Sequence, residues 1–104
     1  MSTSGTTAPI TLAGLRARRE EILAVARQHG ASNVRVFGSV VRGDADRRSD
    51  VDFLVDMEKG RSLLDMGGLL MDLSDLLGRE VDVVTEKGLR ERVRSRVLAE
   101  ARSL

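Results

Sequence analysis

Apolar residues recur along the chain with helical spacing in three segments. The first runs from Thr11 to His29, where leucine, isoleucine, valine and alanine return every three or four residues and predict one amphipathic helix. A second and wider apolar face lies between Ser62 and Gly78. Ser62 with Asp65 three positions later has the pattern of a capping box, and the glycine is a helix stop. A third face covers residues 89–101.

Three shorter segments are rich in β-branched residues and alternate between apolar and polar positions, which predicts strands. They lie at Val34–Phe37, Ser49–Phe53 and Glu80–Thr85, and a short helix over Val40–Arg42 is expected between the first two. The order helix, strand, short helix, strand, helix, strand, helix predicts an α/β or α+β domain. We expect a small mixed sheet of three to four strands flanked by helices.

Two acids share the second predicted strand, at positions 50 and 52. Alternation sends Val51 and Phe53 to one face and both Asp50 and Asp52 to the other. Two carboxylates about 4 Å apart repel by roughly 4 kcal/mol at an effective dielectric near 20, so protonation, separation into solvent or a bound cation must compensate. A few hard oxygen ligands suit Mg²⁺ better than Zn²⁺.

The turn after the first strand offers a complementary feature for anions. Gly38 lacks a Cβ and lets a ligand approach the backbone, and Ser39 is predicted to cap the short helix that ends at Gly43. The first amides of that helix would point at an anion. Amides for phosphate and acids for metal, on adjacent elements, indicate a metal and nucleotide site.

These residues form a joint motif, Gly38-Ser39, ten residues, then Asp50-x-Asp52. The motif resembles the signature of the polymerase-beta-type nucleotidyltransferase superfamily. The fuller pattern, Phe-Gly-Ser-x-x-Arg-Gly followed by Ser-Asp-x-Asp-x-x-Val, is similar to its minimal branch, the MNT-domain antitoxins of HEPN/MNT toxin–antitoxin pairs. The resemblance extends from about Val34 to the C-terminus and implies a polymerase-beta-like nucleotidyltransferase fold.

The resemblance also implies a chemistry for the acids. A third acid on a neighbouring strand joins the pair in this family, and Asp82 in the third predicted strand is the matching residue. Asp50, Asp52 and Asp82 would then be catalytic and hold Mg²⁺, with two ions on the triphosphate. Such two-metal sites stabilise the entering and the leaving oxygen of an in-line displacement.

The remaining implications concern substrate and partner. Gly38 and Ser39 would bind the terminal phosphates, and Arg42 would stabilise departing pyrophosphate. By resemblance, the donor is ATP and AMP passes to a tyrosine of a HEPN toxin, which the transfer neutralises. The chain itself contains no tyrosine and is expected to need a partner for acceptor recognition, since its 104 residues suit one domain.

Composition narrows the other function classes. The formal charge of +1 and the two aromatic residues argue against direct nucleic-acid binding by a basic patch or by base stacking. The N-terminus has no signal-peptide pattern, no apolar run is long enough to span a bilayer, and cysteine is absent, so a cytoplasmic protein is expected. Residues 1–9 are predicted to be a disordered tail and residues 10–104 the domain.

Two other functions stay open on the sequence. The chain could be a catalytically silent antitoxin that acts by binding alone, or a transferase that acts on a small molecule or an RNA end. The nucleotide, the number of AMP groups transferred, and the choice between a homodimer and a hetero-oligomer also stay open.

Overall fold

Helices and strands alternate along the chain, as the computed structural model shows for residues 10–46 and 48–104. The elements are α1 (Leu12–Ala17), α2 (Arg19–Gln28), β1 (Ala31–Phe37), α3 (Ser39–Arg42), β2 (Val51–Met57), α4 (Leu63–Leu77), β3 (Val81–Val84), the 3-10 helix η2 (Glu86–Gly88), α5 (Glu91–Glu100) and β4 (Arg102–Ser103). The tail predicted over residues 1–9 lies outside the described residues.

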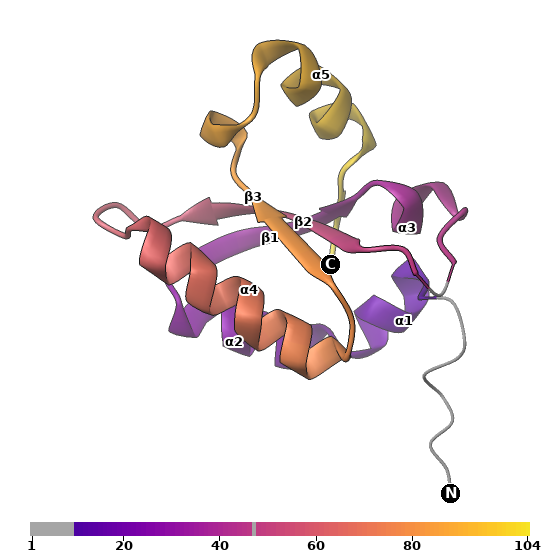
Figure 1. Ribbon diagram of the computed structural model, residues 1–104, viewed down its shortest axis with the longest axis horizontal. Helices are drawn as coiled ribbons and strands as arrows, with labels where there is room; N and C mark the ends of the chain where they lie inside the picture. Colours follow the sequence, from indigo (N-terminus) through magenta and orange to yellow (C-terminus); the bar gives the residue numbers. More distant parts are fainter. Residues whose placement is uncertain (1–9, 47) are drawn as a thin grey trace, which may run out of the picture.

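The strands form one mixed sheet in the order β3-β2-β1-β4 (Figure 1). β1 is antiparallel to β2 and to β4, whereas β2 and β3 run parallel. The mixed sheet and the α/β class predicted from the sequence are confirmed. The short strand β4 was not predicted, because two polar residues at the end of a helix carry no alternating pattern.

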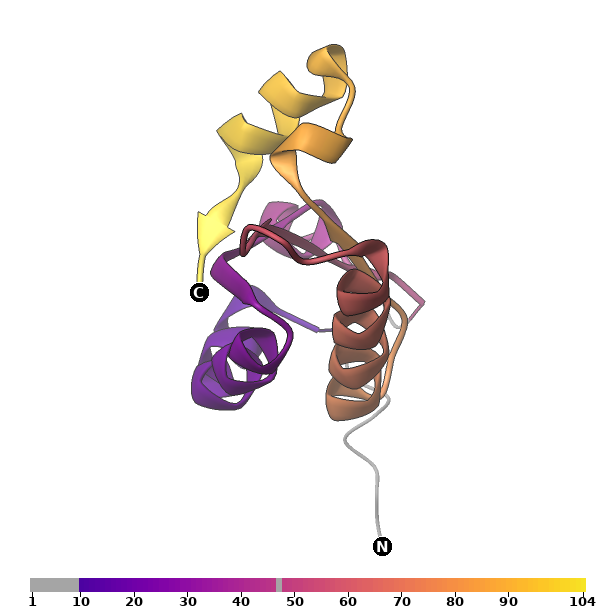
Figure 2. The same cartoon turned by 90° about the vertical axis from the view of Figure 1, so that its left-hand side faces the viewer.

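Helices lie on both sides of the sheet: α1, α2 and α4 are on one side and α5 is on the other (Figures 1 and 2). Val51, Phe53 and Val55 are fully buried in the main core on the side of α2 and α4, as alternation predicted. Leu54 projects to the opposite face and is also fully buried. β2 is therefore buried on both faces, and Asp50 and Asp52 lie at the start of this largely buried strand.

The single helix predicted from Thr11 to His29 was wrong. The chain forms α1 and α2 instead, because Arg18 leaves helical geometry with φ −109° and ψ 21°. Arg18 Nη1 donates to the carbonyl oxygen of Leu76 at 2.9 Å, near the end of α4. This contact joins segments far apart in sequence, so the apolar periodicity of residues 11–29 could not predict it.

The long helix α4 begins and ends as predicted. Ser62 Oγ accepts a hydrogen bond from Leu64 N–H at 3.2 Å, and Asp65 accepts one from Ser62 N–H at 2.9 Å, which completes the capping box. Gly78 ends the helix in the left-handed region at φ 68°.

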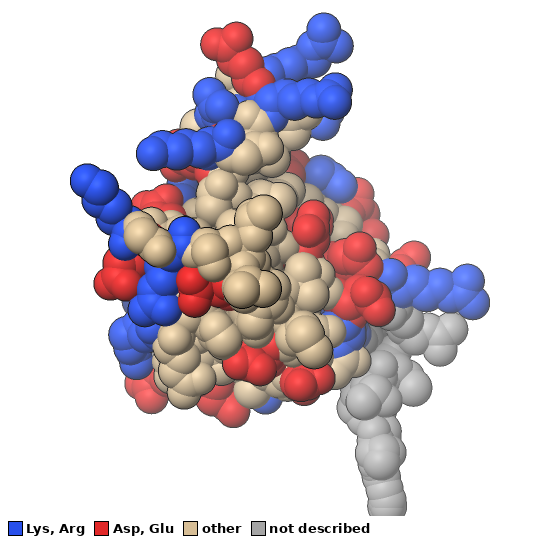
Figure 3. Space-filling model, turned by 60° about the vertical axis from the view of Figure 1, so that its left-hand side comes forward, with Lys and Arg blue, Asp and Glu red and all other residues tan. Residues whose placement is uncertain are grey.

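The surface differs between elements. Lys and Arg side chains gather over α5, and a broad uncharged surface lies below that helix with acidic and basic side chains around it (Figure 3). Helix α4 exposes Leu63 and Leu64 at 83% and 87% of their areas. None of the helices within residues 10–46 and 48–104 combines the length and the apolar character needed to cross a bilayer.

Candidate functional site

Two of the predicted acids lie side by side where β2 and β3 begin. In the parallel pairing of these strands, Asp52 is the register partner of Asp82 and Val51 that of Val81. Neighbouring strands are about 4.8 Å apart, and register partners project to the same face, so the two carboxylates share one side of the sheet. Asp50 directly precedes β2 and is exposed. The structure thus brings the predicted acids to one end of the sheet.

The charges of this cluster act most strongly on Asp52, which is half-buried. Burial first, and then the negative charges of Asp82 and Asp50 in that order of importance, together raise the pKa of the Asp52 carboxyl to about 6. Arg42 acts in the opposite direction. The repulsion expected from the sequence is therefore present, and a cation bound at these oxygens would relieve it.

The glycine of the predicted turn packs directly against the acid cluster. Gly38 has φ 82° and ψ −152°, a conformation essentially restricted to glycine. A Cβ built at this position would collide with the Asp52 side chain. Because Phe37 also pairs with Asp52 across β1 and β2, the turn is fixed beside that carboxylate by the sheet register.

The short helix differs from its prediction at its start. Ser39 is the first residue of α3, not its cap, and no side chain caps the helix at Gly38. The sharp turn at Gly38 starts the helix one residue early, which moves Ser39 inside it. Its end at Gly43 is as predicted, in the left-handed region at φ 83°. Arg42, in the last turn of α3, lies close enough to the acids to affect the pKa of Asp52.

One residue of this region was missed by the sequence analysis. Glu100, at the end of α5, accepts hydrogen bonds from Gly38 N–H at 2.7 Å and from Arg42 Nη1 at 3.0 Å. Burial opposes ionisation of this carboxyl, but these two donors outweigh it and hold its pKa below its usual range. No spacing rule connects Glu100 with Gly38, because 62 residues separate them.

The donor set fits a hard divalent cation. Among the described residues, no three or more His, Cys, Asp or Glu side chains already form a ligand group for a metal ion. Mg²⁺ is usually bound by one or two carboxylates together with water and substrate phosphates, so a preformed group of three is not required. The paired Asp52 and Asp82, with Asp50 near them in the chain, would offer oxygen ligands of the kind that such a site uses.

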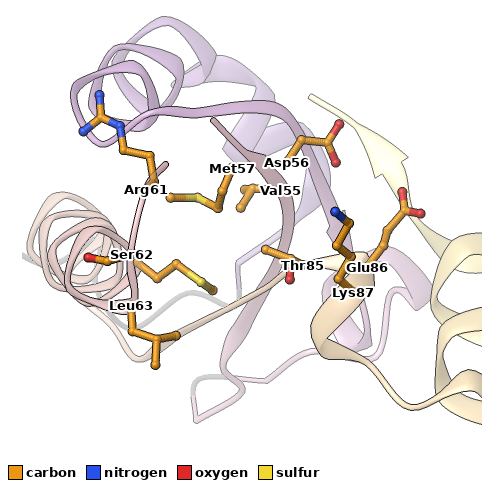
Figure 4. A pocket seen from close by; sticks show the side chains of 10 residues that line it. Val55, Asp56, Met57, Arg61, Ser62, Leu63, Thr85, Glu86 and Lys87 are labelled. Atoms are coloured by element: carbon orange, nitrogen blue, oxygen red, sulfur yellow. The ribbon is translucent and has the colours of Figure 1, made fainter. Parts of the chain in front are cut away.

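A pocket lies at the opposite ends of β2 and β3, away from the acids. It measures about 740 Å³ and is lined by the last residues of β2, the start of α4 and the segment after β3, including Met57, Leu63, Met66 and Thr85 (Figure 4). The acids lie where β2 and β3 begin, and none of them lines this pocket. We therefore place the candidate site at the acids, where the electrostatics are perturbed, and not in this pocket.

Comparison with known proteins gives close relatives. The family model of the nucleotidyltransferase domain matches residues 19–104. Protein adenylyltransferase MntA of Thermococcus cleftensis is 45% identical over 71 residues, which cover 68% of this chain and 72% of the relative.

Two solved structures are also similar. One, described as a "putative minimal nucleotidyltransferase", has a TM-score of 0.80 and 53% identity and covers 91% of this chain and 97% of its own. The other is a tri-AMPylated Shewanella oneidensis HEPN toxin in complex with an MNT antitoxin. Its match has a TM-score of 0.65 and 17% identity, covers 85% of this chain and 69% of that one, and supports the fold alone. The family match and the close relatives show that this chain belongs to the nucleotidyltransferase domain family.

Proposed function

We propose that this chain is a Mg²⁺-dependent protein adenylyltransferase. It acts as the antitoxin of a toxin–antitoxin pair and neutralises a HEPN toxin by transferring AMP from ATP to one of its tyrosines. The observation that carries the proposal is the register of Asp52 against Asp82 beside the Gly38 turn. A purely structural sheet has no need to crowd carboxylates, because the crowding raises the energy of the ionised protein.

In this proposal the acids bind and orient the reacting groups. Asp50 and Asp52 would hold Mg²⁺ with the triphosphate, and Asp82 would also hold metal and act on the attacking hydroxyl. When bound there, Mg²⁺ would neutralise the charge that develops on the entering and leaving oxygens. The tyrosine oxygen attacks the α-phosphorus, the bond from that phosphorus to the bridging oxygen breaks, and pyrophosphate leaves. Asp82 accepts the proton of the hydroxyl.

The turn after β1 binds the phosphates. The missing side chain of Gly38 lets the turn approach the Asp52 carboxylate closely, so phosphates bound at Gly38 and Ser39 would lie next to the acids, where Arg42 adds a positive charge. Phosphoryl transfer depends mainly on positioning and charge neutralisation. The phosphate turn, Arg42 and the three acids are groups of the types that this chemistry needs.

The partner is inferred from relatives. A curated relative is named as a protein adenylyltransferase, and a structural neighbour contains an AMPylated HEPN toxin bound to its antitoxin. The present chain has no tyrosine that could receive AMP within itself. A protein acceptor from outside the chain is therefore the simplest target for the same chemistry.

The test is transfer of label from α-³²P-ATP to the cognate toxin in the presence of Mg²⁺. We expect label on the toxin that survives denaturation, and its loss in Asp50→Asn and Asp52→Asn. Asp56→Asn is the matched control, because Asp56 lies on the same strand but pairs with Arg35 at 3.0 Å and not with the acid cluster. That variant should keep its transferase activity.

Other outcomes would point to the alternative functions. Inhibition of the toxin that persists in both acid variants, with no label moved, would identify an antitoxin that acts by binding alone. Label on an RNA end or on a small molecule, without any on the toxin, would identify a different acceptor. In the absence of toxin, Mg²⁺ with ATP at 100 times its dissociation constant should add about 2.7 kcal/mol to the stability of the wild-type chain.

A further inference from the structure

The end of α5 joins the C-terminal part of the chain to the phosphate turn. One oxygen of Glu100 accepts the Gly38 N–H, and the other accepts Arg42 Nη1. A single carboxylate thus holds both the backbone that begins the turn and the guanidinium at its end. Only 21% of the Glu100 side chain is exposed, so this contact is partly shielded from water.

The sheet itself fixes the position of Glu100. After α5 and the single residue Ala101 the chain forms β4, where Arg102 pairs with Val36 and Ser103 with Arg35 of β1. Leu104 follows and is buried in the main core. Since β1 leads directly into Gly38 and runs antiparallel to β4, Glu100, two residues before β4, is carried to the same place as the turn.

The carboxylate also completes the hydrogen bonding of the strand end. The pairing of β1 with β4 covers Arg35 and Val36, and Gly38 lies beyond it. Its N–H therefore donates to the Glu100 side chain where a longer strand would offer a carbonyl oxygen. This bond needs only an oxygen acceptor, and the amide oxygen of a glutamine can still accept it, although more weakly than a carboxylate.

The contact between Glu100 and Arg42 depends on the negative charge of the Glu100 carboxylate. The Arg42 side chain is 52% exposed, and a free arginine of that kind samples many rotamers. Glu100 binds its Nη1 at 3.0 Å and Asp44 approaches its Nε at 3.5 Å. No described residue bonds Nη2, so the guanidinium is held on two nitrogens and keeps donors for a further anion.

We propose that Glu100 is a positioning residue for the nucleotide: it holds the Arg42 guanidinium next to the acid cluster, oriented to receive the triphosphate. The inference rests on the proposed role of Arg42 in phosphate binding. Pre-orientation removes part of the ordering cost that ATP binding would otherwise meet. A carboxylate that merely occupied the place of a phosphate would have the opposite effect, because its removal would strengthen ATP binding.

The experiment is a double-mutant cycle on ATP affinity, using the full chain with Mg²⁺ and calorimetric titration. Glu100→Gln keeps the acceptor for Gly38 and removes the charge that holds Arg42. We expect about tenfold weaker ATP binding, the factor that corresponds to 1.4 kcal/mol, with an unchanged melting temperature. In an Arg42→Ala background the same substitution should change affinity less than twofold. Glu91→Gln, at the other end of α5, is the matched control and should leave affinity unchanged.

Each result has a distinct meaning. A tenfold loss that appears only when Arg42 is present supports the inference. Equal losses in both backgrounds, no loss, or tighter binding in Glu100→Gln would overturn it while leaving the proposed function intact. Failure of the wild-type chain to bind ATP with Mg²⁺ would instead overturn the proposed function and this inference with it.

A second variant covers the case in which Glu100→Gln lowers the melting temperature. Glu100→Asp keeps the charge and withdraws the carboxylate by one methylene group. ATP binding should then weaken in the presence of Arg42 and stay unaltered in the Arg42→Ala background. A loss of affinity independent of Arg42 would again count against a positioning role.

Discussion

Replacing Asp52 by asparagine should stabilise the chain in the absence of metal and nucleotide, although the same change removes a proposed metal ligand. Asp52 is half-buried and faces Asp82 across the parallel strands β2 and β3. Burial and the neighbouring acids make its ionised form unfavourable in the folded state, so its pKa is raised from 3.8 to about 6. Asparagine has nearly the same shape and carries no charge, which removes this penalty.

The size of the effect follows from the shift. At about 1.4 kcal/mol per pKa unit, a shift of this size corresponds to roughly 3 kcal/mol as an upper bound. Because Asp52 is half-exposed, solvent screening reduces the expected gain to about 1 kcal/mol. For a domain of this length, about 1 kcal/mol raises the melting temperature by roughly 4–8 °C.

The gain should depend on pH in a defined direction. A carboxyl whose pKa is raised on folding contributes stability below its unfolded pKa of 3.8, and that contribution is lost as the pH rises through about 6. The asparagine variant does not suffer this loss. Its advantage over wild type should therefore be small near pH 4 and complete near pH 8.

The assay is thermal unfolding of both proteins in EDTA across this pH range, with Asp56→Asn as control. Asp56 lies on the same strand but pairs with Arg35, so its substitution should be neutral or slightly destabilising at pH 8. If Asp52→Asn is no more stable than wild type at pH 8, or its advantage is the same at pH 4, the acids are not crowded and the electrostatic argument for the site fails.

Two further predictions concern the turn and the core. Gly43→Ala should lower the free energy of unfolding by about 1–2 kcal/mol, because Gly43 is left-handed but has open space around it. Gly38→Ala should lower it more and abolish stabilisation by ATP, because its Cβ also collides with Asp52. Urea unfolding of the two variants with and without ATP measures both effects, and equal losses of stability would contradict the packing of Gly38 against the acid. Leu69→Ala should lower the free energy of unfolding by about 2–5 kcal/mol, because Leu69 is fully buried. Leu64 on the same helix is 87% exposed, so Leu64→Ala should change it by less than about 0.5 kcal/mol. Similar urea midpoints for the two variants would contradict the burial of this face of α4.

The predictions about single elements were most accurate where local signals were strong. The capping box at Ser62 and the glycine at position 78 set both ends of α4 because they satisfy the helix's own terminal groups. Alternation along β2 set which residues enter the core, and it placed Asp50 and Asp52 away from Val51 and Phe53. These features depend on neighbours in the chain, so the sequence alone was sufficient.

Other features depend on contacts between distant segments, and only the tertiary structure decided them. The helix break at Arg18 accompanies a hydrogen bond to Leu76, and the burial of Leu54 on the second face of the sheet depends on the chain beyond β3, where η2 contacts β2. The pairing of Asp52 with Asp82 is a matter of strand register, which the sequence suggested only through resemblance. Glu100 could not have been found at all, because the chain must fold back through β4 before its carboxylate meets Gly38. Helix capping and apolar periodicity depend on residues close together in the chain, so a short segment is enough to predict them. The assembly of a site depends on contacts between distant segments, which only the complete fold brings together.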